Sequence, residues 1–179
     1  MNLGSRAIVV LAIAFTIPAT AKHSPAQRRA QEADVQVLDS VPVRTDLYPA
    51  DSDAKKEIDE AVSRAAVKHK RVLLIFGANW CYDCHVLDRA LHDGDAGKVV
   101  SENFLLVHVD ISEGEKNSEL VTTYKIPLEK GVPAVAILDA HGKLLYSSGD
   151  GEFEAARKML KKDLVAFLQR WRAESGTTR

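Results

Sequence analysis

The sequence predicts an α/β fold, a mixed central sheet flanked by helices on both faces. Two observations lead to this prediction. Short runs of uniformly apolar residues, typical of buried strands, alternate with segments whose apolar residues recur at helical spacing. The order of these segments is helix, strand, helix, strand, helix, strand, strand, helix, which indicates a parallel β-α-β half followed by an antiparallel hairpin. An extra N-terminal arm and the first helix precede this unit.

Composition narrows the function before any motif is considered. The 179-residue chain is 46% hydrophobic and 27% charged, which is the balance of one globular domain. Lys and Arg number 24 against 25 Asp and Glu, so the chain lacks the positive field that favours nucleic acid, and we expect no nucleic-acid partner. Its two cysteines cannot form a disulfide-dense scaffold, and they sit close together at Cys81 and Cys84.

The first segment has the pattern of a cleaved signal peptide. Arg6 precedes an apolar run from Ala7 to Ile17, and Pro18 and a small-x-small triplet ending at Ala21 follow. The apolar run is much shorter than the roughly 20 residues that span a bilayer. We therefore expect residues 1–21 to be removed after Ala21, with no membrane insertion afterwards. This predicts a periplasmic or secreted protein in an oxidising compartment.

The next segment is predicted to change from a leader into an ordered arm over residues 22–52. Its start is polar and it contains three prolines, and its later apolar residues are expected to lie against the domain: Val41, Val43, Leu47 and Tyr48. The domain is predicted over residues 53–172, and residues 173–179 are expected to form a flexible tail. Ser52 or Asp53 can cap the first helix, whose apolar residues share one face: Ile58, Ala61, Val62, Ala65 and Ala66.

The first predicted strand leads directly to the cysteine pair. The run from Val72 to Phe76 is short and fully apolar, and Gly77 closes it. After Cys81, apolar residues continue at helical spacing as far as the breaker Gly94, so the pair lies where a strand gives way to a helix. The remaining predicted elements are a helix from Lys98 to Asn103, a strand from Phe104 to Val109, a helix between Asn117 and Tyr124, hairpin strands Pro133 to Leu138 and Lys143 to Ser147, and a helix from Glu152 to Trp171.

Two motifs resemble the thioredoxin family. One is Trp80-Cys81-Tyr82-Asp83-Cys84 after a buried strand, and the other is Gly131-Val132-Pro133 at the opening of a later strand. The stretch from Phe76 to Cys84 is similar to exported bacterial thioredoxin-like proteins, and the resemblance covers residues 54–171. It implies a thioredoxin fold in which Val132 and Pro133 form a cis peptide beside the cysteines. Together with Trp80, they would line the groove where a substrate backbone docks.

The cysteine spacing suits thiol–disulfide exchange, which needs one stabilised, exposed thiolate and a second thiol nearby. A thiol at a helix N-terminus faces unpaired backbone N–H groups and the positive end of the helix dipole, which lower its pKa. This geometry and the resemblance assign Cys81 as the attacking thiol and Cys84 as the resolving thiol. We expect an enzyme without a bound cofactor or metal, acting as a monomer on protein thiols or disulfides, with an unidentified electron donor.

Neighbouring side chains suggest how the pair is tuned. The Asp83 carboxylate should disfavour a Cys81 thiolate, which stabilises the disulfide and favours a reductant or isomerase role. His85 is interpreted either as a partly exposed histidine or as a second tuning residue that acts when protonated. Family members often carry a buried acid in the strand before the cysteines, but Ile75 occupies that position here. How its absence is compensated is left open.

Three other readings of the pair remain. The disulfide could be purely structural, in a non-enzymatic module that uses the thioredoxin groove for binding. Half of a zinc site is also conceivable, although the sequence has no second Cys-x-x-Cys. Finally, Cys81 to His85 spells Cys-x-x-Cys-His, the attachment motif of c-type haem. Flanking strand-like runs and the scarcity of a distal ligand, with Met159 alone in the last helix, weigh against haem.

Overall fold

The computed structural model describes residues 41–173. The predicted signal peptide with its cleavage after Ala21, the leader to residue 40 and the tail from residue 174 lie outside this part. Within it, the elements are α2 (Ala54–Lys68), β1 (Arg71–Gly77), α3 (Tyr82–His92), α4 (Gly94–Asn103), β2 (Phe104–Asp110), α5 (Ser118–Thr123), η1 (Leu128–Lys130), β3 (Ala134–Leu138), β4 (Leu144–Ser147), η2 (Ala156–Lys158) and α6 (Lys161–Arg170).

Four strands form one mixed sheet in the order β2-β1-β3-β4. Strand β1 pairs parallel with β2 and antiparallel with β3, and β3 pairs antiparallel with β4. A turn in which the Asp139 carboxylate accepts from the N–H groups of His141 and Lys143 connects the last two strands. The parallel half and the hairpin that the sequence predicted are therefore both present.

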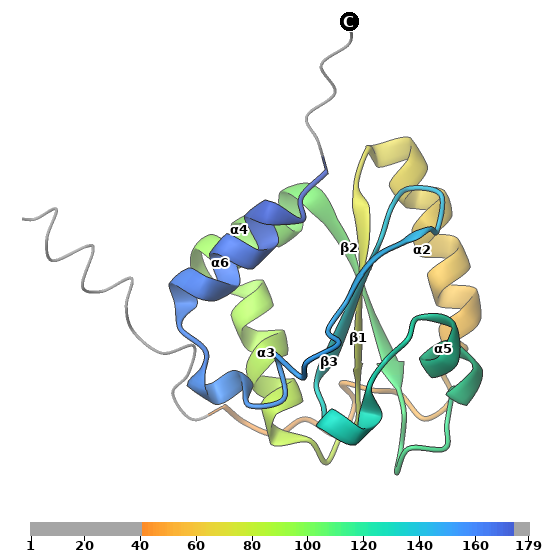
Figure 1. Ribbon diagram of the computed structural model, residues 1–179, viewed down its shortest axis with the longest axis vertical. Coiled ribbons are helices and arrows are strands. Elements are labelled where there is room, and N and C mark those ends of the chain that lie inside the picture. The colour runs from red at the N-terminus through yellow and green to blue at the C-terminus, as the bar shows by residue number, and fades with distance from the viewer. Residues whose placement is uncertain (1–40, 174–179) are drawn as a thin grey trace, which may run out of the picture.

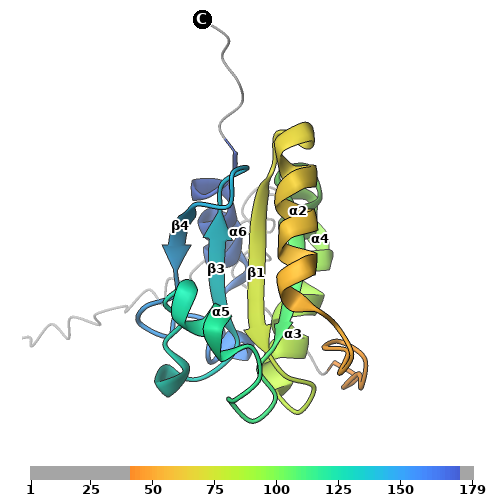
Figure 2. The ribbon, with the colours of Figure 1, turned by 90° about the vertical axis from the view of Figure 1, so that its right-hand side faces the viewer.

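Helices cover both faces of the sheet, as Figures 1 and 2 show. Alternate residues of β1 point to opposite faces. Leu73 and Ile75 pack into the apolar core beneath α3, α4 and α6. Leu74 and Phe76 pack into a second core against α2 and α5. Because both faces are covered, β1 is apolar along almost its whole length.

Two predicted helices differ from the observed ones. The helix expected from Glu152 is instead a turn and the 3-10 segment η2, and α6 begins only at Lys161. Phe153 and Ala156 are buried as their spacing suggested, but the backbone is extended at Met159 and Leu160, which breaks the helix. The segment is held instead by α3, whose Asp83 accepts a hydrogen bond from a backbone N–H of η2.

The helix expected from Lys98 begins earlier, at Gly94. Asp93 is extended, and Gly94 adopts a φ of 56°, so a single-residue break separates α3 from α4. Gly97 allows this close approach, because a Cβ there would lie 2.6 Å from the backbone of His92. Across residues 41–173, the helices are too short or too polar to cross a bilayer.

Candidate active site

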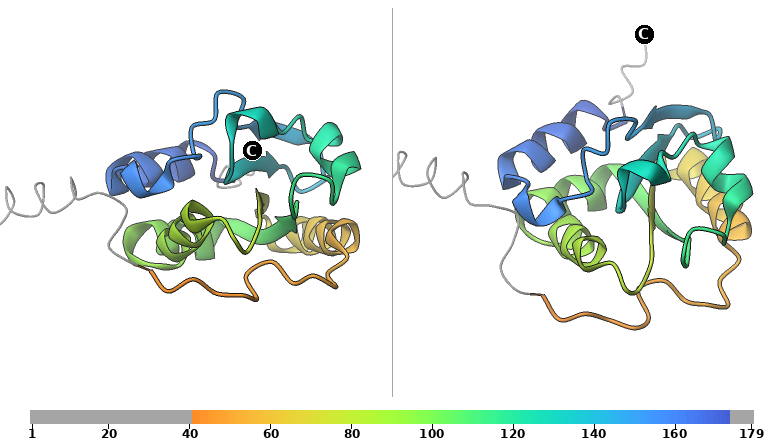
Figure 3. Two further views of the ribbon diagram at one scale, coloured as in Figure 1. Left: turned by 90° about the horizontal axis from the view of Figure 1, so that it is seen from below. Right: turned by 60° about the horizontal axis from the view of Figure 1, so that its bottom comes forward.

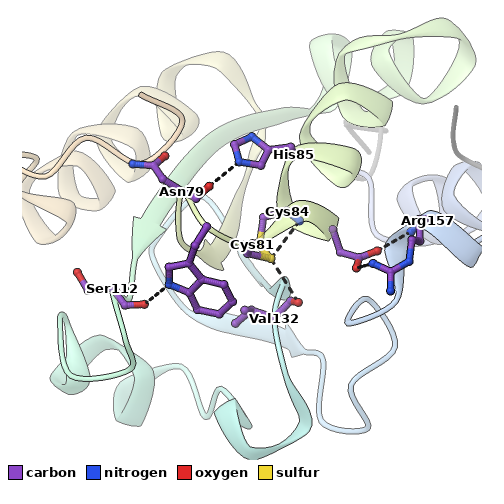
Figure 4. Close-up of a disulfide and its surroundings, with 9 residues drawn as sticks. Asn79, Cys81, Cys84, His85, Ser112, Val132 and Arg157 are labelled. Carbon is purple, nitrogen blue, oxygen red and sulfur yellow. Dashed lines mark hydrogen bonds and ion pairs between the residues drawn. A yellow bond between two sulfur atoms is a disulfide. The ribbon is translucent and has the colours of Figure 1, made fainter. Parts of the chain in front are cut away.

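Cys81 and Cys84 are joined by a disulfide at the start of α3 (Figure 4). Cys81 is the N-cap residue, and its Sγ accepts a hydrogen bond from the backbone N–H of Cys84 at 3.2 Å. The first sulfur therefore faces the unpaired N–H groups at the helix N-terminus, as the sequence predicted. Such an environment stabilises a thiolate on Cys81.

The two sulfurs differ in how they are covered. Cys84 is fully buried, whereas Cys81 is 4% exposed and lies 3.5 Å, Sγ to oxygen, from the carbonyl of Val132. The Val132-Pro133 peptide bond is cis, as the resemblance implied. Trp80 stands beside them, 57% exposed, and its indole N–H donates to the carbonyl of Ser112 at 3.0 Å. The predicted groove residues thus lie together around the more accessible sulfur.

Asp83 is buried and paired rather than facing Cys81 alone. Its carboxylate forms an ion pair with the Arg157 guanidinium and accepts the Arg157 backbone N–H at 2.9 Å. Figure 4 shows Arg157 on the segment that contains η2. The positive partner offsets the charge that was expected to oppose a Cys81 thiolate. Arg157 lies 74 residues away in sequence, and no local signal identifies it.

His85 is buried, so the expectation of a partly exposed histidine was wrong. Its Nε2 lies 2.8 Å from the carbonyl of Asn79, and its Nδ1 accepts the backbone N–H of Arg44 at 3.5 Å. A carbonyl can only accept, so Nε2 donates to Asn79. Both ring nitrogens of His85 are therefore engaged by backbone groups.

The N-terminal arm lies against the cysteine site, passing α3 on its way to α2 (Figure 3). The Asn79 side chain binds it twice, accepting from the Tyr48 N–H at 2.9 Å and donating to the Tyr48 carbonyl at 2.8 Å. Leu47 and Tyr48 are buried and pack with both cysteines. Val43, which was expected to pack, is instead 56% exposed.

A second polar cluster lies beneath the arm. The buried Asp88 on α3 has its carboxylate 3.0 Å from Nε2 of His108 on β2 and 3.4 Å from Nδ1 of His92. Burial alone would raise the pKa of Asp88, but the close contact with His108 and its charge, with help from His92, outweigh burial and lower that pKa. Within residues 41–173, no group of three or more His, Cys, Asp or Glu is arranged to hold a metal ion.

Sequence reasoning identified the cysteines and their groove but not the groups that surround them. Asn79 and Tyr48 were missed as a pair because 31 residues separate them. One local signal for Tyr48 existed, since it lies in the arm among apolar residues expected to pack on the domain. A tyrosine in such a position can carry its hydroxyl into a buried site.

Comparison with known proteins agrees with this geometry. Residues 53–140 match the model of a family described as thioredoxin-like. A crystal structure of a disulphide isomerase from Xylella fastidiosa Temecula1 is 33% identical, with a TM-score of 0.65, and the match covers 69% of this chain and 95% of that chain. The chain belongs to the thioredoxin-like family. Its fold and its bridged cysteine pair are those of a thioredoxin-like thiol–disulfide oxidoreductase.

A curated relative extends the comparison to a longer protein. The thiol:disulfide interchange protein DsbD of Pseudomonas fluorescens is 25% identical over 117 residues. That match covers 64% of this thioredoxin-like chain but only 18% of the relative. The chain therefore corresponds to a small part of the relative's length.

Proposed function

We propose that the protein is an exported thiol–disulfide oxidoreductase that acts on protein thiols through Cys81 and Cys84. The observation that carries the proposal is the position of the two sulfurs at the start of α3. Cys81 caps the helix beside Val132 and is 4% exposed, while Cys84 is fully buried. Attack by or on the Cys81 sulfur, followed by resolution from Cys84, fits this difference in access.

The proposed exchange balances as a two-electron transfer. In the reduced protein, the Cys81 thiolate attacks one sulfur of a substrate disulfide and expels the other as a thiolate, which takes up a proton. Cys84 loses its proton and attacks the Cys81 sulfur in the mixed disulfide, releasing the second substrate thiol. The Cys81–Cys84 disulfide forms, and two electrons pass from the pair to the substrate. An external dithiol donor must then reduce the pair again.

A reductant or isomerase role is the direction we favour. The relative from Xylella fastidiosa is described as a disulphide isomerase, and the one from Pseudomonas fluorescens as a thiol:disulfide interchange protein. The Asp83 charge, which would disfavour a Cys81 thiolate and so favour a reductant, supports this direction less strongly because Arg157 offsets it. Export rests on the signal-peptide pattern of residues 1–21. Trp80, Val132 and Pro133 are the proposed docking surface for an extended substrate backbone.

Insulin reduction with an external dithiol tests the activity. Cys81→Ser should abolish turnover, because no attacking thiol remains. Cys84→Ser should also abolish turnover but accumulate a mixed disulfide at Cys81, which mass spectrometry detects. The two serine variants are matched controls for each other, and measurable turnover in either variant, or a mixed disulfide that forms equally in both, would contradict the assigned roles. Mixed disulfides trapped by Cys84→Ser in cells would identify the substrates.

A structural disulfide is the competing function, and a redox titration against glutathione separates it from the proposal. A working pair should equilibrate in the range of thioredoxin-like enzymes, from about −270 mV to about −120 mV. A structural disulfide should lie below about −300 mV and resist reduction by the glutathione pool. A value in the second range, without insulin reduction, would leave a binding module as the function.

A further inference from the structure

The hydroxyl of Tyr48 is buried beside the disulfide without a hydrogen-bond partner. The residue is 1% exposed, and no donor or acceptor among the described residues reaches its oxygen. An unsatisfied buried hydroxyl is costly, and native proteins rarely keep one without a reason. Two hydrogen bonds between the Asn79 side chain and the Tyr48 backbone hold this residue in place.

The Tyr48 hydroxyl and the Cys84 sulfur both lie close to Gly77. A Cβ placed on Gly77 would lie 2.5 Å from the Tyr48 oxygen and 2.6 Å from the Cys84 Sγ. Two atoms that lie so close to one point are near neighbours. Tyr48 also belongs to the same packed cluster as both cysteines. The hydroxyl therefore lies next to the sulfur that is released when the disulfide opens.

The surroundings of Tyr48 keep its hydroxyl protonated, so that it can donate a hydrogen bond. Burial, together with the nearby carboxylates of Asp88 and Asp110, raises the pKa of Tyr48 far above its ordinary value. The ring of His108 packs edge-on against it, with centroids 5.3 Å apart, and offers no hydrogen bond to the hydroxyl. Tyr48 thus stays protonated and can give a hydrogen bond, but it cannot accept a proton as a base.

We propose that Tyr48 is a positioning residue whose hydroxyl donates a hydrogen bond to the Cys84 sulfur in the reduced protein. This inference deepens the proposed function and rests on it. In the disulfide state the hydroxyl has no partner within residues 41–173. Once the disulfide opens, Cys84 carries a thiol or thiolate, which is a better acceptor, and the buried donor is satisfied. Tyr48 therefore stabilises the dithiol relative to the disulfide.

The hydrogen bond affects the resolving step without adding a proton or an electron to it or removing one from it. Cys84 gives up its S–H proton, its thiolate attacks the Cys81 sulfur, and the substrate thiolate leaves and takes up a proton. Tyr48 keeps its own proton throughout and lowers the free energy of the Cys84 thiolate. The two electrons still pass from the cysteine pair to the substrate disulfide.

Tyr48 places a hydrogen-bond donor beside the pair, whereas position 75 carries an isoleucine. Ile75 is buried among apolar side chains beneath α3, and its partner in β2 is His108. The polar groups on this side of the sheet are carried by β2, α3 and the arm rather than by β1. The Tyr48 hydroxyl comes from the arm, which lies outside the residues of the family match.

Tyr48→Phe tests the inference, because it removes the hydroxyl and keeps the ring. Against glutathione, we expect the dithiol–disulfide equilibrium to move about tenfold toward the disulfide, a potential about 30 mV more negative. In a Cys81→Ser background, Cys84 is the remaining thiol. There, Tyr48→Phe should lower its thiolate fraction about tenfold at a given pH, read by ultraviolet absorbance.

Tyr124→Phe is the matched control, because Tyr124 packs near Phe76 in the other core, under α2 and α5. It should leave both readouts within twofold of the wild type. If Tyr48→Phe also leaves both unchanged in a folded protein, or moves the equilibrium toward the dithiol, the inference is wrong. Neither readout requires turnover of a substrate, so both remain decisive for Tyr48 even if insulin reduction fails and the proposed function falls.

Discussion

The cysteine pair has two flanks, the η2 side and the arm side, and they differ in whether their buried polar groups have hydrogen-bond partners. On the η2 side, the Asp83 carboxylate is fully engaged by the Arg157 guanidinium and backbone N–H. On the arm side, the Tyr48 hydroxyl is also buried but lacks a partner among the described residues. One flank is satisfied with the disulfide closed, whereas the other gains a hydrogen bond only after the disulfide opens. The first therefore fixes the end of α3, and the second can respond to the redox state.

This difference separates stability from redox poise. Groups satisfied in the disulfide state should affect mainly the free energy of unfolding, because their contacts do not depend on the sulfur chemistry. A group that gains a partner on reduction should affect mainly the potential. Substitutions on each flank can break or sharpen this distinction.

The largest effect is expected from Gly77→Ala, because its methyl group would push the Tyr48 hydroxyl and the Cys84 sulfur away from residue 77. The new methyl group would lie 2.5 Å from the Tyr48 oxygen and 2.6 Å from the Cys84 sulfur. We expect the free energy of unfolding to fall by about 1–3 kcal/mol, as for other overpacked sites. Denaturant unfolding of the oxidised protein measures it.

Gly149→Ala is the matched control for that change, since a Cβ at Gly149 meets nothing within 4 Å. Its effect should stay within about 0.5 kcal/mol. Equal stability of the two alanine variants would contradict the close packing of Tyr48 and Cys84 around Gly77.

Arg157→Gln breaks the satisfied flank. The buried Asp83 would keep its charge but lose its cationic partner, so the free energy of unfolding should fall by about 1–2 kcal/mol, less than for a fully buried pair because Arg157 is half-exposed. The uncompensated carboxylate should also lower the Cys81 thiolate fraction and make the potential more negative. Denaturant unfolding and glutathione equilibration measure the two effects.

Lys158→Gln removes a neighbouring, exposed positive charge and should change neither quantity measurably. If it shifts the potential as much as Arg157→Gln does, the effect comes from net charge rather than from the pairing with Asp83.

Asp88→Asn tests the cluster beneath the arm through its pH dependence. The folded-state pKa of Asp88 is below its ordinary value of 3.8, so its contribution to stability is present above about pH 4. It is lost as the pH falls through the lower folded-state pKa. The variant should be less stable than the wild type by on the order of 1 kcal/mol at neutral pH. Urea unfolding across the acidic range should show the two proteins converging.

Asp51→Asn, at an exposed position in the arm, is the control and should match the wild type throughout. A stability difference for Asp88→Asn that stays constant into acid would show that the pairing with His108 does not depend on the carboxylate charge.

The smallest effect is expected from Tyr82→Phe, which removes a second tyrosine hydroxyl near the disulfide. Its oxygen accepts a long hydrogen bond of 3.4 Å from the Val41 N–H at an exposed site, where water can replace it. The free energy of unfolding should change by less than about 0.5 kcal/mol, and the potential should not shift measurably. A potential shift as large as that of Tyr48→Phe would remove the distinction between a buried donor and an exposed hydroxyl.

The sequence was sufficient for the parts of the molecule that local patterns determine. The run from Val72 to Phe76 is apolar because both faces of β1 are covered, and that uniformity is visible without a structure. The spacing of Cys81 and Cys84 after this strand, together with Gly131-Val132-Pro133, carried the resemblance to the thioredoxin family, and that resemblance implied the cis peptide. Each of these signals lies within a few residues of the feature that it predicts.

Predictions failed where distant segments decide the outcome. Arg157 and Asp83 meet across 74 residues, and their contact fixes η2 where helical spacing suggested an unbroken helix. His85 is buried because the arm covers it, and the arm's path depends on the side chain of Asn79. Periodicity correctly indicated that Phe153 and Ala156 are buried, but it cannot distinguish a continuous helix from two shorter turns that cover the same core.

The reciprocal bonds between Asn79 and Tyr48 have a consequence for how the protein can be divided. The family match begins at residue 53, after the arm has already passed the disulfide. A chain trimmed to that boundary would keep both cysteines and the whole sheet, yet it would open Gly77, Cys84 and His108 to water. The sulfur that is now fully covered would become accessible to solvent oxidants and foreign thiols. The shortest fragment that preserves the protection of Cys84 therefore begins before Tyr48.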